Sequence, residues 1–291
     1  METMGFLGPV GTHSEAAACY LNSMLERPCR MEGFPTIYAV IQAVAEGKLD
    51  TCLVPVENSL EGSINITLDA LAHSDSVVVE RELVWSVHNQ LMVKDTGVPV
   101  RRILSHAQPL AQCRDYLRDH FPDAQLEAVA STAFAAKRAS EGKPSDGLAA
   151  ICTRKAGELN GLVTLAEEIQ DNHTNCTRFY QLRRKGCALD ETEAQKALVI
   201  CQIDGKNAGR LCEVLQELAK RNVNLTRIES RPARTGLGEY IFFFDVDLPK
   251  QIEDFHDAIE AVKRRSIWVR NPGRFPVIRA DRMDKDDLSI E

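Results

Sequence analysis

Residues 171–179 read Asp171-Asn172-His173-Thr174-Asn175-Cys176-Thr177-Arg178-Phe179. Hydroxyls, amides and one guanidinium crowd into this segment, which lies between apolar runs at 162–165 and 179–182. Such groups suit a core poorly, whereas polar loops at strand ends present side chains into ligand-binding clefts. The planar fork of Arg178 matches a carboxylate, to which it can donate two charge-assisted hydrogen bonds. The stretch therefore predicts a loop that binds a small anion, with a solvated polar turn as the alternative.

On either side of this loop, the chain alternates short apolar runs with helical periodicity. Strands are predicted at 4–7 and 51–54, with one helix carrying Ala17 to Met24 and another from the cap Thr36 to Gly47. A second alternation of strands and helices covers 103–152, with one helix predicted around Cys113. This order predicts an α/β fold with two lobes of parallel or mixed sheets around a cleft, as in periplasmic binding proteins. Ligands in such folds bind at the carboxyl ends of the strands.

The pattern changes after a polar, acidic linker at about 186–196. Apolar periodicity then predicts the order β-α-β-β-α-β, which is ferredoxin-like. We therefore expect a larger domain over 1–185, with lobe 1 at about 1–80 and 165–185 and lobe 2 at about 81–164. A smaller domain is expected over 196–276. A charged tail is expected over 277–291.

Composition narrows the function classes. The chain has 291 residues and a net charge of −7, and the basic face of a nucleic-acid-binding protein is not expected. Nine cysteines without a C-x-x-C pair predict reduced thiols in a cytosolic protein. A metal site at His173 and Cys176 lacks a recognised ligand spacing, so none is predicted. We expect no signal peptide and no membrane-spanning run, hence a cytoplasmic location.

A second polar segment follows the first predicted strand. Residues 8–14 read Gly8-Pro9-Val10-Gly11-Thr12-His13-Ser14, which puts glycines and hydroxyls at a strand-to-helix turn. Exposed N–H groups and the positive end of a helix suit an anion at such a turn. The segment lacks the lysine of a phosphate-binding loop. A tight turn capped by Ser14 is the alternative.

Several motifs together resemble the prephenate dehydratase family and occur in that family's order. They are the turn Gly8 to Ser14, Val54-Pro55-Val56-Glu57-Asn58-Ser59 with Glu61-Gly62-Ser63, Ser105-His106-Ala107-Gln108-Pro109-Leu110-Ala111-Gln112-Cys113, Ser131-Thr132-Ala133, and Thr177-Arg178-Phe179. The C-terminal part is similar to the ACT regulatory domain, through Gly209-Arg210-Leu211 and Glu229-Ser230-Arg231-Pro232. The resemblance covers the chain to about residue 280.

The resemblance implies a cofactor-independent lyase that converts prephenate to phenylpyruvate in phenylalanine biosynthesis. It implies that Thr177 contacts the departing hydroxyl and that Arg178 holds a carboxylate. A threonine hydroxyl does not titrate in this pH range, so Thr177 is interpreted as a hydrogen-bond donor or relay, and Glu57 as the candidate proton source. Neutral donors to the substrate are expected from Asn58, Ser105, Gln112, Ser131, Thr132 and Asn175, and from Thr12 and Ser14 of the turn. Phe179 is expected to pack beside the site, and His106 and His173 to be structural or at its rim.

The same resemblance implies allosteric control by phenylalanine at an interface between two ACT domains, and hence a homodimer or homotetramer. The regulatory residues would be Gly209, Leu211, Glu229, Ser230, Arg231 and Pro232. The chain departs from the family pattern at Ala107 (usually proline), Ala130 (usually glutamate), Ala208 (usually proline) and Arg210 (usually alanine).

Two other functions fit the sequence. Arogenate, whose amino group replaces the keto oxygen of prephenate, would require the same mechanism. A non-catalytic solute-binding module would have the same two lobes and cleft. The predicted absence of a signal peptide and the intact Thr177-Arg178-Phe179 favour the enzyme.

Overall fold

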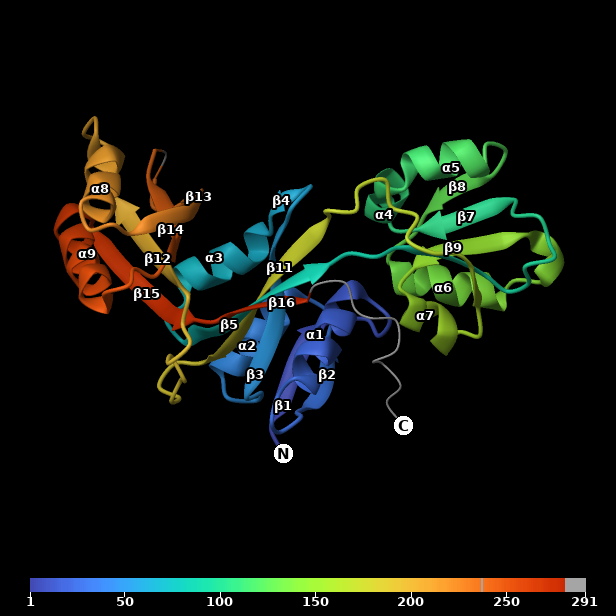
Figure 1. The fold of residues 1–291 in the computed structure, drawn as a ribbon, viewed down its shortest axis with the longest axis horizontal. Coiled ribbons are helices and arrows are strands. Elements are labelled where there is room, and N and C mark those ends of the chain that lie inside the picture. Colours follow the sequence, from blue (N-terminus) through green and yellow to red (C-terminus); the bar gives the residue numbers. More distant parts are fainter. Residues whose placement is uncertain (237, 281–291) are drawn as a thin grey trace. The chain divides into compact units, whose positions relative to one another are not determined.

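The computed structural model describes residues 1–236 and 238–280. The chain divides into two compact units. Figure 1 labels their helices and strands. The first unit holds Met1–Val40 and Trp85–Thr177, together with Ala280. The second unit holds Ile41–Val84 and Arg178–Arg279.

The first unit contains a five-stranded sheet in the order β10-β6-β9-β7-β8. Its strands are β6 (Gln90–Val93), β7 (Arg102–Ser105), β8 (Gln125–Ala128), β9 (Leu148–Cys152) and β10 (Val163–Ala166). Strand β7 runs parallel to β8 and β9, whereas β6 is antiparallel to β9 and β10. Helices α4 (Ala107–Gln112), α5 (Arg114–His120), α6 (Thr132–Glu141) and α7 (Arg154–Leu159) and the short 3₁₀ turn η1 (Pro144–Asp146) accompany it.

Strand β9 shows why this sheet is covered on both faces. Successive side chains of a strand point to opposite faces. Ala149 and Ile151 accordingly belong to one buried cluster, and Ala150 and Cys152 to another. The same unit holds β1 (Thr3–Leu7) and β2 (Arg30–Phe34), which pair in parallel with Thr3 opposite Arg30, and helix α1 (His13–Ser23).

In the second unit, four strands follow the order β16-β5-β11-β3, and β4 pairs with β3. The elements of this part are α2 (Ile37–Ala45), β3 (Thr51–Asn58), β4 (Gly62–Ser63), α3 (Asn65–His73), β5 (Val77–Ser86), β11 (Cys176–Arg184) and β16 (Val277–Ala280). The predicted cap of α2 is confirmed, because the Thr36 hydroxyl accepts a hydrogen bond from the Ala39 N–H at 3.1 Å.

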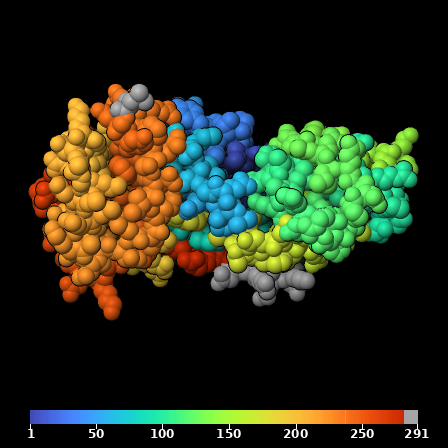
Figure 2. All heavy atoms as spheres, turned by 90° about the horizontal axis from the view of Figure 1, so that it is seen from above, coloured from blue at the N-terminus to red at the C-terminus, as the bar shows by residue number. Residues whose placement is uncertain are grey.

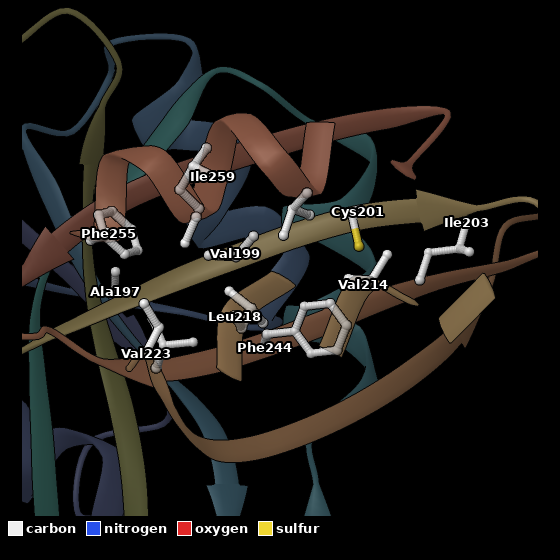
Figure 3. Packing of buried hydrophobic residues seen from close by; sticks show 13 residues of the cluster. Ala197, Val199, Cys201, Ile203, Val214, Leu218, Val223, Phe244, Phe255 and Ile259 are labelled. Atoms are coloured by element: carbon white, nitrogen blue, oxygen red, sulfur yellow. The ribbon is translucent and has the colours of Figure 1, made fainter. Parts of the chain in front are cut away.

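The ferredoxin-like prediction is confirmed. The elements are β12 (Lys196–Ile203), α8 (Arg210–Ala219), β13 (Asn224–Pro232), β14 (Tyr240–Asp247), α9 (Ile252–Arg265) and β15 (Trp268–Phe275), with sheet order β13-β14-β12-β15. Figure 3 shows alternate residues of β12 facing Val214 and Leu218 of α8 and Phe255 and Ile259 of α9. These contacts bury the apolar stripe of each helix, which is the main stabilisation available to such a helix.

Four local predictions were wrong or incomplete. Thr177 and Arg178 lie on β11 and not in a loop, because this strand begins three residues before the predicted apolar run 179–182. The helix predicted around Cys113 is two helices, α4 and α5. Helix α7 was not predicted. Of the predicted tail, 277–280 form β16, and 281–291 lie outside the described residues.

None of the nine cysteines, all of which lie in the described residues, forms a disulfide. Burial raises the pKa of the Cys113, Cys152 and Cys201 thiols to about 12 in each case, so these side chains act as small apolar groups. In the part of the chain that the structure describes, no cluster of His, Cys, Asp or Glu side chains could hold a metal ion. Nor does any helix there have the length and apolar character needed to cross a bilayer.

Candidate active site

One edge of the five-stranded sheet gathers most of the predicted donors of the first unit. Strands β7, β8 and β9 are parallel, so their carboxyl ends lie at the same edge. Ser105 is the last residue of β7, and its carbonyl accepts the Val129 N–H at 2.8 Å. Helix α6 begins after β8 with Ser131 as its N-cap, and α7 begins after β9 with Thr153 as its N-cap. Polar groups thus concentrate where ligands bind in such sheets.

Several of these groups already make hydrogen bonds within the protein. The buried Ser105 hydroxyl donates to the Ile151 carbonyl at 2.7 Å, and the Ser131 hydroxyl accepts from the Phe134 N–H at 3.0 Å. Thr132 is buried in the first turn of α6. Asn175 is buried as well, and its carbonyl accepts the Val87 N–H at 2.9 Å. Their roles toward a substrate stay predictions.

Gln112, a predicted donor, and the predicted rim residues His106 and His173 lie close to these elements. Gln112 ends α4, and its carbonyl accepts the Asp171 N–H at 2.8 Å. The Asp171 carboxylate in turn accepts the N–H groups of Asp115 and Tyr116, both at 3.0 Å. His106 caps α4 and is exposed, and His173 is exposed beside Gln170.

The glycine turn reaches the same edge. Gly11 has a φ of +91°, and a Cβ there would lie 3.0 Å from the Ala156 Cβ, so glycine is required both by conformation and by space. The Thr153 hydroxyl donates to the Gly11 carbonyl at 3.1 Å. This contact fixes the turn against the start of α7.

The amino terminus of α1 is already neutralised by the chain itself. The Gly11 N–H donates to the Glu15 carboxylate at 2.5 Å. The Thr12 hydroxyl accepts the Glu15 N–H at 3.3 Å and donates to the Leu7 carbonyl at 3.2 Å. The predicted cap, Ser14, is therefore wrong, since Thr12 is the N-cap and Ser14 lies in the first turn. An acidic side chain in the first turn competes for the N–H groups that an anion would need.

Sequence reasoning missed a pair beside this turn, formed by the half-buried His13 and the buried Asn89. His13 Nε2 lies 3.4 Å from Asn89 Oδ1, and the Asn89 N–H donates to Gln170 Oε1 at 3.0 Å. The pKa of His13 is lowered to about 4, mainly because the ring is removed from water. The hydrogen bond with Asn89 raises this pKa, and the nearby His88 lowers it. His13 is therefore neutral at pH 7.

This burial predicts a pH-dependent stability. The unfolded chain binds a proton on His13 near pH 6.5 and the folded chain only near 4, so stability is full above 6.5 and is lost as the pH falls toward 4. The gap between these values corresponds to about 3 kcal/mol. We expect His13→Gln to lose less free energy of unfolding than the wild type between pH 7 and pH 4, as measured by denaturant titration. The exposed His120→Gln is the control, and equal pH profiles for all three proteins would contradict the prediction.

The second unit contains a dense ionic group around Arg178. Its guanidinium donates from Nη1 to Glu57 Oε2 at 2.7 Å, and from Nη2 to Asp245 Oδ2 at 2.7 Å. Glu82 accepts two hydrogen bonds, from Nε at 3.2 Å and from Nη2 at 2.6 Å. Only 15% of the Arg178 side chain is exposed. The predicted carboxylate clamp is thus held by three carboxylates of its own chain.

Further cations complete this group, which we call the carboxylate–arginine cluster: Glu57, Glu82, Asp245 and Glu229 with Arg178, Arg227 and Lys196. Lys196 Nζ lies 3.5 Å from Glu82, and Arg227 lies 3.4 Å from Glu57 and 3.8 Å from Asp245. Removing one partner from such a buried network leaves an uncompensated charge, which costs several kcal/mol. Asp245 follows Phe242-Phe243-Phe244 in β14, whereas Glu82 follows the charged residues Glu80 and Arg81 in β5. A charge directly after an apolar run was the sequence signal that could have found Asp245, but Glu82 has no such signal.

Asn58 and Phe179 have mainly structural contacts. Asn58 Oδ1 accepts the N–H groups of Leu60 and Glu61, at 3.0 and 3.1 Å, and so shapes the turn between β3 and β4. Phe179 is 1% exposed, in agreement with a packing role.

Those predicted regulatory residues that lie on β13 divide between its two faces. Glu229 and Arg231 are half-buried, whereas Ile228 and Ser230 are exposed, as the alternation of a strand requires. Glu229 accepts a hydrogen bond from Ser63 of β4, and Arg231 binds Asp69 of α3 at 2.9 Å. Figure 2 shows the light-blue surface of β4 and α3 against the orange surface of β13. Pro232 ends β13, Gly209 is the N-cap of α8 with a φ of +84°, and Leu211 packs on the domain core.

Known protein families match both parts of this chain. The family model described as prephenate dehydratase matches residues 4–187, and the ACT domain model matches 199–264. The chain belongs to the prephenate dehydratase family. A prephenate dehydratase of Methanocaldococcus jannaschii is 34% identical over 269 residues, which cover 92% of this chain and 96% of that protein.

Solved structures give a similar result. The crystal structure of a prephenate dehydratase from Arthrobacter aurescens in complex with L-Phe aligns with a TM-score of 0.83 and 34% identity, over 94% of this chain and 90% of that chain. A protein described as a novel type of quorum quenching acylase aligns with a TM-score of 0.82 and 25% identity, over 95% of this chain and 98% of that one. Prephenate dehydratase family members thus share the fold of both units, including the ACT domain.

Proposed function

We propose that this chain converts prephenate to phenylpyruvate, and that phenylalanine controls the reaction through the ACT domain. The observation that carries the proposal is the match of the prephenate dehydratase model to residues 4–187, which include all five motifs of the catalytic part. The reaction releases carbon dioxide and water. The electron pair of the broken C–C bond aromatises the ring as the ring hydroxyl leaves, so the driving force lies in the substrate and no cofactor is required.

The protein then has to orient the ring and assist the hydroxyl. We assign Thr177 as the donor to the departing hydroxyl, Arg178 as the group that binds a substrate carboxylate, and Glu57 as the proton source. Positioning supplies a large share of such a rate, and assistance by a donor typically adds about 10²–10⁴-fold. Glu57 accepts a hydrogen bond from Arg178, so the two proposed groups lie side by side, and Glu57 would have to take up a proton before it could donate one. Thr12, Ser14, Asn58, Ser105, Gln112, Ser131, Thr132 and Asn175 remain proposed donors to the substrate, and Phe179 a packing residue beside it.

For regulation, we propose that phenylalanine binds where two ACT domains meet, with residues 1–185 as the catalytic domain and 196–276 as the regulatory domain. The exposed face of β13, with Ile228 48% exposed next to Ser230, is suited to such a contact. We expect a homodimer or homotetramer. Light scattering would measure a mass of two or four chains of 32.4 kDa, and a monomer at all concentrations would contradict this assignment.

The test is an assay of the pure protein with prephenate, which follows the absorbance of phenylpyruvate with and without phenylalanine. Parallel reactions with arogenate and with an acyl-amide substrate separate the dehydratase specificities from an acylase. We expect turnover of prephenate that phenylalanine changes. Turnover of arogenate alone would assign the substrate differently, and tight binding of prephenate without turnover would favour a binding module.

A further inference from the structure

Within the carboxylate–arginine cluster, no cation is left over for a substrate. Four carboxylates surround three cations, namely Arg178, Arg227 and Lys196. Both Nη2 hydrogens of Arg178 are taken, by Glu82 and by Asp245. A substrate carboxylate that accepts two hydrogen bonds from Nη1 and Nη2 must therefore displace a carboxylate of the chain. Which carboxylate yields decides how strongly the enzyme binds its substrate.

Glu82 is the least suited to yield. It holds Arg178 through two hydrogen bonds, is 1% exposed, and has Lys196 as a second counter-ion at 3.5 Å. Two parallel hydrogen bonds between a guanidinium and a carboxylate are the strongest arrangement of this pair. Glu57 lies on the neighbouring strand β3 and is itself a proposed participant in the reaction.

Asp245 differs in three ways. It binds Arg178 through one oxygen, at 2.7 Å. Its other oxygen accepts the Tyr180 hydroxyl at 3.1 Å, and burial together with the Asp245 charge raises the pKa of Tyr180 well above its usual value of 10, so the hydroxyl remains a donor. Asp245 also belongs to β14 of the ACT domain, whereas Arg178 belongs to β11.

A replacement partner for Asp245 is already in place. Arg227 Nη1 is buried and has no hydrogen-bond acceptor among the described residues, and it lies 3.8 Å from Asp245 Oδ2. Only 8% of the Arg227 side chain is exposed, and its Nη2 is occupied by Ser63 at 2.7 Å. A buried donor without an acceptor is costly, so a small shift that brings Nη1 to Asp245 would be favourable. Asp245 could then leave Arg178 without becoming an unpaired buried charge.

We propose that Asp245 is a positioning residue of the ACT domain that competes with the substrate carboxylate for Arg178, and that Arg227 takes over Asp245 when substrate binds. The inference rests on the proposed role of Arg178 as the carboxylate-binding group. It makes the affinity for substrate depend on two neighbouring strands of the regulatory domain, β13 and β14. A ligand that shifts these strands would change that affinity through this exchange of partners.

The test compares Asp245→Asn with the wild type. Asparagine keeps the shape and the acceptor for Tyr180 but removes the competing charge. We expect KM, and the Kd for prephenate measured by calorimetric titration, to fall by about tenfold, with kcat within about twofold. A residue that only supports the fold would give the opposite split, with a weaker affinity or a lower kcat. Unchanged or weaker binding by the folded variant would overturn the proposal.

Two controls sharpen this test. Asp247→Asn makes the same change two residues along β14, where the carboxylate accepts a hydrogen bond from Asn224 at 2.8 Å, and it should leave KM and Kd unchanged. Asp245→Glu keeps the charge and should not tighten binding. The titration does not require turnover. A wild type that binds prephenate without converting it would therefore refute the proposed function, and leave this inference to be judged by the shift in Kd.

A structure of the protein with prephenate bound, in the Thr177→Ala background, decides the matter if Asp245→Asn does not fold. We expect the distance between Arg178 Nη2 and Asp245 Oδ2 to lengthen from 2.7 Å beyond hydrogen-bonding range, and Arg227 Nη1 to approach Asp245. An Arg178–Asp245 hydrogen bond that persists with substrate bound would overturn the proposal.

Discussion

Thr177→Ala is expected to lower kcat by about 10²–10⁴-fold, which is the usual contribution of a positioned donor to a proton-dependent step. Thr177 lies half-buried near the start of β11, one residue before the carboxylate–arginine cluster. Alanine keeps the backbone of the strand and removes only the hydroxyl that would assist the departing ring hydroxyl. The measurement is kcat on prephenate together with the thermal unfolding midpoint, which should change little.

The matched control is Thr174→Ala. Thr174 precedes the strand, is exposed, and donates its hydroxyl to Asn172 Oδ1 at 2.7 Å. We expect kcat of this variant to stay within about twofold of the wild type, as for a surface substitution. Near-normal turnover by a folded Thr177→Ala would remove Thr177 from the mechanism.

Arg178→Lys should affect both substrate binding and stability. An ammonium group cannot reproduce the fork that bridges Glu57, Glu82 and Asp245, so at least one of these carboxylates loses its partner. We expect a loss of about 3 kcal/mol in the free energy of unfolding, near the lower limit for a broken buried pair. KM should rise by about tenfold or more, because the second charge-assisted hydrogen bond to the substrate is lost.

Arg183→Lys on the same strand is the control for this variant. Arg183 binds Glu80 at 3.0 Å, nearer the end of β11. A lysine can keep the ion pair with Glu80, so we expect a smaller loss of stability than for Arg178→Lys and an unchanged KM. If Arg178→Lys left both stability and KM at wild-type values, the guanidinium would be neither a structural bridge nor a carboxylate clamp.

Local patterns in the sequence predicted much of the fold. The βαββαβ domain followed from clear periodicity, such as Leu211, Val214, Leu215 and Leu218 on one face of α8. The cap Thr36 was predicted for the same reason, because capping depends on residues three positions apart. The run 179–182 was predicted as part of the sheet, but the start of β11 was missed because Thr177 and Arg178 are polar. Tertiary contacts of the buried aromatic residues that follow them extend the strand to Cys176.

The partners of the site residues depend on long-range contacts that a sequence does not reveal. The motif indicated Arg178, but Asp245 is 67 positions away and Glu82 is 96 positions away along the chain. The turn at Gly11 was predicted to bind an anion, yet Glu15, only four positions away, already occupies its N–H group. In that case the signal was present, since a glutamate three residues after a threonine N-cap is typical of a self-capped helix.

The most direct test of the central claim is to measure both products of the reaction of the pure protein with prephenate. We predict that phenylpyruvate and carbon dioxide appear in equal amounts, at a rate far above that of prephenate alone at the same pH. Thr177→Ala, at the same concentration, should release both products at a rate that is lower than the wild-type rate by about 10²-fold or more. Prephenate that remains intact with folded wild-type protein, or that decays at the uncatalysed rate, would contradict the account.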